Sequence, residues 1–365
     1  MGTEKNKFTI GFLFDYLYED YTNQIFNNIL QTCRNYDLNF IGFGGGTFKA
    51  SAYKYRDQKN VVFDLAGTYT LDGIIALTGV FGNFVSQNRV KTLLGRYDNL
   101  PIVSIGLSID GMDNVTNVVI DNNSGMEALL SHLIEAHHCR KIAFIKGAFN
   151  NYDAVKRFES YKRVLARYNI PLNNDLVIDG NFDYFYGIEA VKILLDQRKI
   201  IPDALVSAND AMAIYAMHEL QDRGFRVPED IMVTGFDDIG MCQAVKPRLT
   251  TIRQSFFDIG RVSVETILAM LRQERVPKNI VLPSKLLIRE SCGCSELEVL
   301  DDIMRFGHTW NMKGGITIAS DNSETVPERL AGAIRQRFPN LTKIIDIVAC
   351  LTELCKKAIS KNSLL

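Results

Sequence analysis

Apolar and polar residues alternate along the chain with two different periods, which predicts a regular succession of strands and helices. The pattern is clearest over residues 202–239. The short apolar run Ala204–Ser207 has the length of a buried strand. Gly224 stands where a left-handed residue would end the helix that follows, and Ile231–Gly235 is a second buried run. The intervening helix is indicated by apolar residues spaced i, i+3, i+4 and i+7, at Ala213, Ala216, Met217 and Leu220.

The same alternation extends over most of the chain. Further strands are expected at residues 8–14, 38–43, 71–77, 101–105, 118–122, 142–145, 176–179 and 280–288. Helices are expected at residues 21–36, 85–97 and 256–272, and two more are expected to begin near residues 122–124 and at Arg157; all but 85–97 show one apolar face. Strands that alternate with helices are typical of a doubly wound α/β fold with parallel sheets.

Polar side chains follow two of the predicted strands directly. Asn209 follows the strand Ala204–Ser207, and Asp237 follows Ile231–Gly235. Ligands of parallel sheets bind beyond the carboxyl ends of the strands, where an amide and a carboxylate could bind hydroxyls or ring nitrogens. An alternative stays open, since Asn209 could cap the next helix and Asp237 could belong to a turn.

Several segments of the chain resemble the LacI/GalR family of ligand sensors, which share their fold with periplasmic sugar-binding proteins. They are Asp72-Gly-Ile-Ile, Arg140-Lys-Ile-Ala-Phe-Ile, Ala208-Asn-Asp, Gly224-Phe-Arg-Val-Pro-Glu-Asp-Ile, Val233-Thr-Gly-Phe-Asp-Asp and Leu249-Thr-Thr-Ile-Arg-Gln. The resemblance covers residues 8–294. It implies two doubly wound Rossmann-like lobes joined by three crossovers, the periplasmic-binding-protein-like type I architecture. Lobe one would take about residues 8–114 and 246–275, and lobe two about 115–245 and 276–294.

The resemblance also implies a ligand site between the lobes. Its expected residues are Asp15, Tyr21, Ser124, Arg157, Phe182, Asn209, Asp237 and Gln254. A guanidinium such as that of Arg157 suits sugar hydroxyls or carboxylates, although a solvated surface arginine is the alternative. Phe182 could stack on a sugar ring or a base, or could fill the core.

The function implied by the resemblance is that of a regulatory module. It would bind a small polar metabolite, most readily a sugar, and transmit lobe closure to a signalling or transcriptional output. The alternatives are a LacI-type transcriptional regulator whose DNA-binding part is absent from this chain, or a periplasmic solute-binding receptor. Family repressors carry a helix-turn-helix headpiece before the first strand, whereas only Met1–Lys7 precede Phe8 here. We therefore expect no direct DNA binding by this chain, a homodimer, and a mainly helical linker or output segment over residues 295–365.

Composition narrows the class of protein. A hydrophobic share of 47% and a charged share of 23% are ordinary for a soluble globular chain. The net charge of −1 argues against a whole-protein electrostatic footprint for nucleic acid. No apolar run reaches membrane-spanning length, no signal peptide is recognisable, and seven cysteines, an odd number, favour reduced thiols. A cytoplasmic location is expected.

Catalytic and metal signatures are weak. We find no Walker loop, nucleophile elbow or zincin helix, and the adjacent residues Asp237 and Asp238 should point apart. The glycines at 42–46 lack the further glycine of a dinucleotide fingerprint. The adjacent residues His137, His138 and Cys139 should not converge on one ion, and the Cys292-x-Cys294 pair has no partners at zinc spacing. The sequence therefore predicts a non-enzyme without a cofactor or a metal site.

Overall fold

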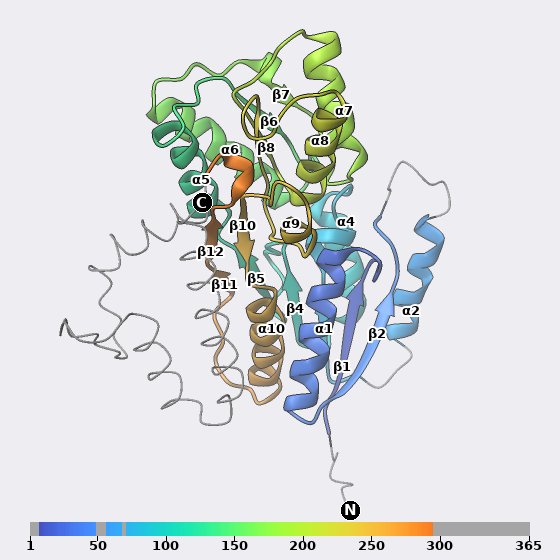
Figure 1. The fold of residues 1–365 in the computed structure, drawn as a ribbon. Helices are drawn as coiled ribbons and strands as arrows, with labels where there is room; N and C mark the ends of the chain where they lie inside the picture. Colours follow the sequence, from blue (N-terminus) through green and yellow to red (C-terminus); the bar gives the residue numbers. More distant parts are fainter. Residues whose placement is uncertain (1–6, 49–55, 68–70, 295–365) are drawn as a thin grey trace, which may run out of the picture. The chain divides into compact units, whose positions relative to one another are not determined.

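The computed structural model describes residues 7–48, 56–67 and 71–294, and these fold into two α/β lobes (Figure 1). The helical segments predicted over 295–365 lie outside the described residues. Among the described helices, none combines the length and apolar character needed to cross a membrane. The predicted fold class is confirmed: both main sheets are parallel and alternate with helices.

Lobe one is built on a six-stranded parallel sheet. Its spatial order is β11 (Asn279–Leu282), β5 (Val115–Ile120), β4 (Ile102–Ile105), β3 (Gly73–Ala76), β1 (Thr9–Phe14) and β2 (Asn39–Gly44). Most of these strands are buried on both faces, as expected when helices cover a parallel sheet on either side.

Helices cover both faces of this sheet. One face carries α1 (Asp20–Asn35) and α10 (Phe256–Leu271), which pack closely against each other. The other face carries α2 (Val62–Ala66), α3 (Thr78–Phe81) and α4 (Gln87–Leu94), with short 3₁₀ turns η1 (Arg56–Val61) and η2 (Gly95–Tyr97) beside them. In α1 the predicted apolar stripe is the buried face, with Ile25, Ile29 and Cys33.

Lobe two is built on a four-stranded parallel sheet. Its order is β7 (Val177–Ile178), β6 (Ile142–Ile145), β8 (Ala204–Ser207) and β9 (Met232–Thr234). Its helices are α5 (Asn122–Glu135), α6 (Tyr152–Arg167), α7 (Phe185–Lys192), α8 (Asp210–Asp222) and α9 (Met241–Ala244). The short turns are η3 (Asn174–Leu176), the π-type η4 (Ile193–Gln197) and η5 (Glu290–Cys292).

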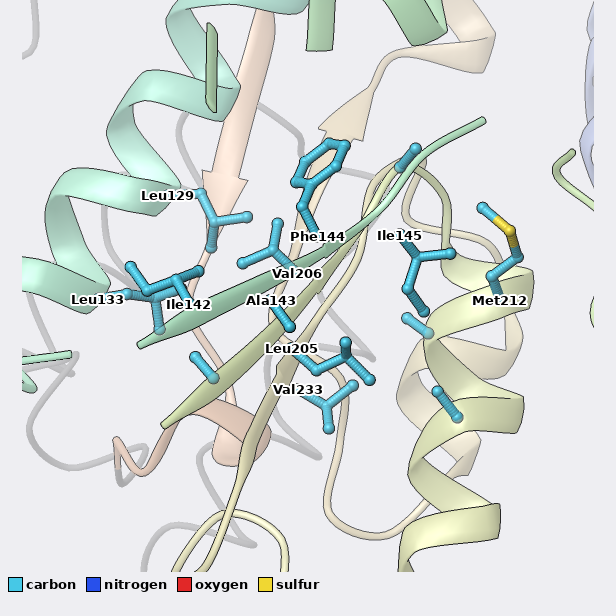
Figure 2. Close-up of a cluster of buried hydrophobic side chains, with 14 of the residues drawn as sticks. Leu129, Leu133, Ile142, Ala143, Phe144, Ile145, Leu205, Val206, Met212 and Val233 are labelled. Carbon is cyan, nitrogen blue, oxygen red and sulfur yellow. The ribbon is translucent and has the colours of Figure 1, made fainter. Parts of the chain in front are cut away.

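The core of lobe two follows from the two-residue repeat of its strands. In β6, Ile142 and Phe144 point to the side of α5, while Ala143 and Ile145 point to the side of α8 (Figure 2). The Phe144 ring also packs against Phe158 and Tyr161 of α6. All four side chains are almost completely buried. The strand thereby joins the helices of both faces into one core.

Three chain segments cross between the lobes, as predicted. They are the β5–α5 link at Asp121, the link from β10 (Thr251–Gln254) to α10 at Ser255, and the link from β11 to β12 (Ser284–Leu287) at Pro283. Strands β10 and β12 form a separate antiparallel ribbon. These crossovers bring the carboxyl ends of both main sheets toward the same inter-lobe region.

The lobe boundaries differ from those predicted. Residues 115–120 and 279–282 pair with the sheet of lobe one, because β5 runs parallel to β4 and β11 continues the same sheet. Lobe one is therefore residues 9–120 and 256–282, and lobe two is residues 122–254 and 284–292. The single closing strand predicted at 280–288 is two strands, because Pro283 offers no backbone N–H to continue a ladder.

Candidate functional site

A cavity of about 270 Å³ lies between the two lobes. This is near the lower end of the range of about 300–1,000 Å³ typical of small-molecule sites. Its walls come from the chain after β1, the start of α1, the α3 region, the first turns of α6, and the loops after β7, β8 and β9. Polar lining residues include Asp15, Tyr16, Glu19, Asp20, Tyr21, Thr22, Thr47, Asn83, Asn151, Asp153, Arg157, Asn181, Asp183, Tyr184, Asn209 and Asp237.

Six of the eight predicted site residues line this cavity: Asp15, Tyr21, Arg157, Phe182, Asn209 and Asp237. Three of them follow strands directly or closely. Asp15 follows β1, Asn209 lies two residues after β8, and Asp237 lies three residues after β9. Their convergence follows from parallel pairing, which places the carboxyl ends of neighbouring strands at one edge of a sheet.

Arg157 is the buried cation of the cavity wall. Its Nε donates to Asn122 Oδ1 at 2.8 Å, and its Nη1 donates to Ala208 O at 2.6 Å. Nη1 also lies 3.3 Å from Asp237 Oδ1, and the guanidinium lies over the Phe236 ring at 3.6 Å from its centroid. These contacts on several sides fix its planar fork, so its remaining donors have a defined direction.

Asp237 is held in place by two donors. Its Oδ1 accepts from Arg157 Nη1 and from Gln254 Nε2, the latter at 2.5 Å. Burial raises the pKa of Asp237 to about 8; the charge of Arg157 opposes this rise, and those of Asp210 and Asp153 add to it. Its φ of +120° is a sparsely populated conformation for a residue with a side chain, and such strain is concentrated at functional sites.

The neighbouring Asp238 points elsewhere, as the sequence predicted. Its two oxygens each lie 2.6 Å from an arginine nitrogen, Oδ2 from Arg253 Nε and Oδ1 from Arg289 Nη2. The two adjacent carboxyl groups therefore have separate surroundings: Asp237 lines the cavity, whereas Asp238 joins the ribbon to the end of lobe two.

Two further buried carboxyl groups give the cavity an excess of acceptors. Asp15 accepts from Thr22 Oγ1 at 2.7 Å, and Asp153 accepts from Asn122 Nδ2 at 2.6 Å. Burial raises the pKa of Asp153, against the effects of Arg157 and Asn122. With Asp237, three buried carboxyl groups and the guanidinium of Arg157 line the cavity, which suits a ligand rich in hydrogen-bond donors.

Contacts across the cavity tie the lobes together. Asn151 of lobe two donates to Gly79 O at 3.0 Å and to Asn83 Oδ1 at 2.6 Å in lobe one. Gly240 N of lobe two donates to Asp20 Oδ2 at 2.8 Å. Tyr21 of lobe one lines the same cavity as Asp237 and Asp153 of lobe two, and burial, followed by the charges of these two acids, raises its pKa.

Asn209 and Phe182 form one edge of the cavity. Asn209 Oδ1 accepts from Met212 N at 3.1 Å, so the capping role considered from the sequence is present. Its Nδ2 donates to Phe182 O at 2.9 Å. Phe182 has a φ of +75°, and its ring packs so closely over Gly147 that a Cβ there would lie 2.3 Å from Phe182 Cζ.

The other two predicted residues do not line the cavity. Ser124 lies in the first turn of α5, where its hydroxyl donates to Asp121 Oδ2 at 2.6 Å. Gln254 is buried behind Asp237 and orients it. The structure therefore makes Ser124 part of a helix cap and Gln254 a support of the cavity wall.

Sequence reasoning missed Asp153, Asn151 and Asn122. A usable signal existed for Asp153, because residues four apart lie on the same face of a helix and Arg157 was already a candidate. Asn151 precedes α6 and caps it through Ala154 N. Asn122 gave no such signal, because the strand-to-helix link that buries it against Arg157 is a tertiary feature.

The raised pKa of Asp237 predicts a pH-dependent stability. The folded protein keeps this proton up to about pH 8, whereas the unfolded chain releases it near 3.8. Because the folded state binds more protons in this window, the free energy of unfolding falls as the pH rises from about 4 to about 8. Asp237→Asn should flatten this fall by up to about 1.4 kcal/mol per pH unit, measured by urea unfolding at pH 5 and pH 7.5. Equal losses for wild type and variant would contradict the assignment.

Known proteins resemble this chain in sequence and fold. The family described as periplasmic binding protein-like domain matches residues 130–292. Catabolite control protein A of Priestia megaterium is 31% identical over 223 residues, covering 60% of this chain and 64% of that protein. The transcriptional repressor PurR of Haemophilus influenzae is 34% identical over 227 residues, with the same two coverages. The chain thus spans less than two thirds of the length of these two relatives.

Solved structures give the same picture. The complex of the transcriptional regulator CelR with cellobiose has a TM-score of 0.66 and 25% identity, and covers 78% of this chain and 85% of that one. A lac repressor dimer bound to operator and the anti-inducer ONPF has a TM-score of 0.67 and 21% identity, covering 79% and 95%. Sequence match and sheet order agree: residues 9–292 have the periplasmic-binding-protein-like fold and resemble the ligand-sensing domains of the LacI/GalR family.

Proposed function

We propose that this chain senses a neutral, hydroxyl-rich metabolite, a sugar or similar polyol, in the cavity between its lobes. The observation that supports this most is the composition of the cavity wall, in which three buried carboxyl groups accompany the guanidinium of Arg157. The carboxyl groups are those of Asp15, Asp153 and Asp237. Carboxyl oxygens accept hydrogen bonds from hydroxyls, and the guanidinium donates to hydroxyl oxygens. A phosphorylated or carboxylate ligand would also face Glu19, Asp20 and Asp183 of the lining, which disfavours an anion.

Aromatic residues at the cavity wall favour a ring-shaped ligand. Tyr16, Tyr21, Phe84, Phe182 and Tyr184 line it. Rings of this kind provide flat apolar surfaces beside polar groups, as the C–H faces of a sugar require. One solved relative is a complex with cellobiose, which is in keeping with a carbohydrate ligand here.

In this proposal the ligand acts by stabilising one arrangement of the lobes. Its contacts to Asp15 and Tyr21 come from lobe one, and those to Arg157 and Asp237 from lobe two. A ligand shifts a conformational equilibrium only by its difference in affinity for the two states, so a ligand bridging both lobes favours the arrangement in which both sets of contacts form.

The output of this sensing is proposed to be transcriptional. The relatives named above are a catabolite control protein and repressors, which supports the LacI-type regulator over the signalling module that the sequence favoured. A homodimer, a cytoplasmic location and the absence of catalysis belong to the same proposal. That this chain does not itself bind DNA stays a prediction from the sequence.

The test is a thermal-shift screen of the purified chain against three ligand classes. Neutral sugars (glucose, galactose, ribose, cellobiose), glucose 6-phosphate, and the bases guanine and hypoxanthine are suitable probes. A neutral sugar at a hundred times its Kd should stabilise the protein by about 2.7 kcal/mol. Stabilisation by the bases or the sugar phosphate, with none by neutral sugars, would overturn the proposed ligand class.

A further inference from the structure

Two histidines and two cysteines far apart in the sequence meet at the far end of lobe two. They are His132 in the last turn of α5, His137 just after it, and Cys292 and Cys294 at the end of the described chain. Their ligand atoms all lie within 4.8 Å of one another. The sequence predicted no metal site, because it considered His137 with its neighbours and the cysteine pair alone. The structure instead brings His137, together with His132, beside both cysteines of the pair.

Four of the six distances among these atoms match a tetrahedron around a small ion, and the other two are within 4.8 Å. His132 Nε2 lies 3.2 Å from His137 Nε2 and 3.6 Å from each cysteine Sγ, and His137 Nε2 lies 3.4 Å from Cys294 Sγ. Zinc bonds of about 2.05 Å to nitrogen and 2.3 Å to sulfur require about 3.3 Å between two nitrogens and about 3.6 Å between nitrogen and sulfur. The four observed separations follow these values within about 0.2 Å.

Hydrogen bonding alone accounts poorly for this arrangement. A ring nitrogen of histidine carries either one hydrogen or one lone pair, so it makes one good hydrogen bond. His132 Nε2 has all three of the other ligand atoms at contact distance: His137 Nε2, Cys292 Sγ and Cys294 Sγ. A central cation shared by all four atoms explains the three approaches together.

The backbone is shaped to present these side chains. His132 and His137 are separated by four residues, within the spacing common for paired histidine ligands of zinc. The cysteines are separated only by Gly293, whose φ of +95° is open to glycine and turns the chain beside the His137 ring. His138, with a φ of +56°, lies three residues after the end of α5 and outside the group.

We propose that His132, His137, Cys292 and Cys294 bind a structural zinc ion. Two thiolates with two imidazoles in tetrahedral array are a typical zinc ligand set, and four protein ligands leave no open position for chemistry. The ion would link α5 to the end of the domain, across a sequence separation of 160 residues between His132 and Cys292. It would also anchor η5, whose Ser291 accepts from Thr250 N and donates to Val233 O.

Metal analysis of the full chain, purified without a histidine tag from zinc-supplemented cells, tests this proposal. We expect about one zinc ion per chain in the wild type and no stoichiometric zinc in the Cys292→Ser/Cys294→Ser variant. His138→Asn and Cys33→Ala are the matched controls: the first removes an adjacent imidazole, the second a buried thiol in lobe one. Both should keep the ion. Wild-type protein without zinc, or a double variant that retains it, would overturn the site.

A second measurement keeps the test decisive if the double variant does not fold. Wild-type protein stripped of metal is titrated with Co²⁺, whose absorption reports tetrahedral geometry and thiolate ligation. We expect a thiolate-to-cobalt charge-transfer band that saturates at one equivalent and disappears on addition of Zn²⁺. The absence of such a band, or a Cys292–Cys294 disulfide found by peptide mass spectrometry in the isolated protein, would contradict the proposal.

Discussion

Arg157→Met should lower the free energy of unfolding by about 3–5 kcal/mol and abolish detectable ligand binding, since it leaves three buried acceptors without their donor. Methionine fills much of the same space but offers no donor. Asn122 Oδ1, Ala208 O and Asp237 Oδ1 each lose a hydrogen bond, and all three residues are buried. The stacking of the guanidinium on Phe236 is lost as well. Urea unfolding followed by circular dichroism measures the first effect, and calorimetric titration the second.

Arg163→Met is the matched control for this substitution. It lies on the same helix but is about half exposed and bonds mainly to the surface residues Glu127 and Asn123. Exposed ion pairs contribute between about 0 and 1 kcal/mol, so this variant should unfold almost as the wild type does and bind ligand normally. Equal destabilisation by the two substitutions would contradict the buried role of Arg157.

Phe144→Ala should also lower the free energy of unfolding by about 3–5 kcal/mol, through a cavity in the core of lobe two. The side chain is fully buried on the central strand β6 (Figure 2). Its ring centroid lies 4.9 Å from that of Tyr161 and 5.6 Å from that of Phe158, both on α6. Loss of the ring removes these contacts. The space it leaves cannot close fully, because β6 is paired with β7 and β8 on its two sides.

Phe149→Ala provides the comparison for this core substitution. Phe149 follows the same strand by a few residues, but its side chain is 77% exposed. Its truncation should change the free energy of unfolding by no more than about 0.5 kcal/mol. If both phenylalanines cost the same, the packing of lobe two around β6 would be wrong.

Much of the fold could be predicted because local patterns and tertiary structure agree. The strand Ala204–Ser207 has the predicted bounds, and the left-handed residue after α8 is Gly224, with a φ of +86°. The errors concern the lobe boundaries, because the lobe to which a strand belongs depends on the strand with which it pairs. Nothing within residues 115–120 says that they pair with β4 rather than with the strands that follow, and only Pro283 signals that the last strand region is divided between two sheets.

The candidate site was predictable where a side chain follows a strand, and less so elsewhere. Asp15, Asn209 and Asp237 are placed by the direction of parallel strands, which the sequence reveals. Asn122 is placed by its bonds to Asp153 and to Arg157, across 31 and 35 residues. The cluster of His132, His137, Cys292 and Cys294 was not predicted for the same reason, because the fold brings its two halves together across 160 residues.

The measurement that tests the central claim most directly is calorimetric titration with the neutral sugar that gives the largest thermal shift. Asp15→Asn alters lobe one, Asp237→Asn alters lobe two, and Ser124→Ala alters a polar residue outside the cavity. If the ligand bridges the lobes, each aspartate substitution should weaken binding by about 2 kcal/mol or more, a factor of about 30 or more in Kd. Ser124→Ala should leave the Kd unchanged. Binding that survives either aspartate substitution unaltered would contradict a ligand site shared by both lobes.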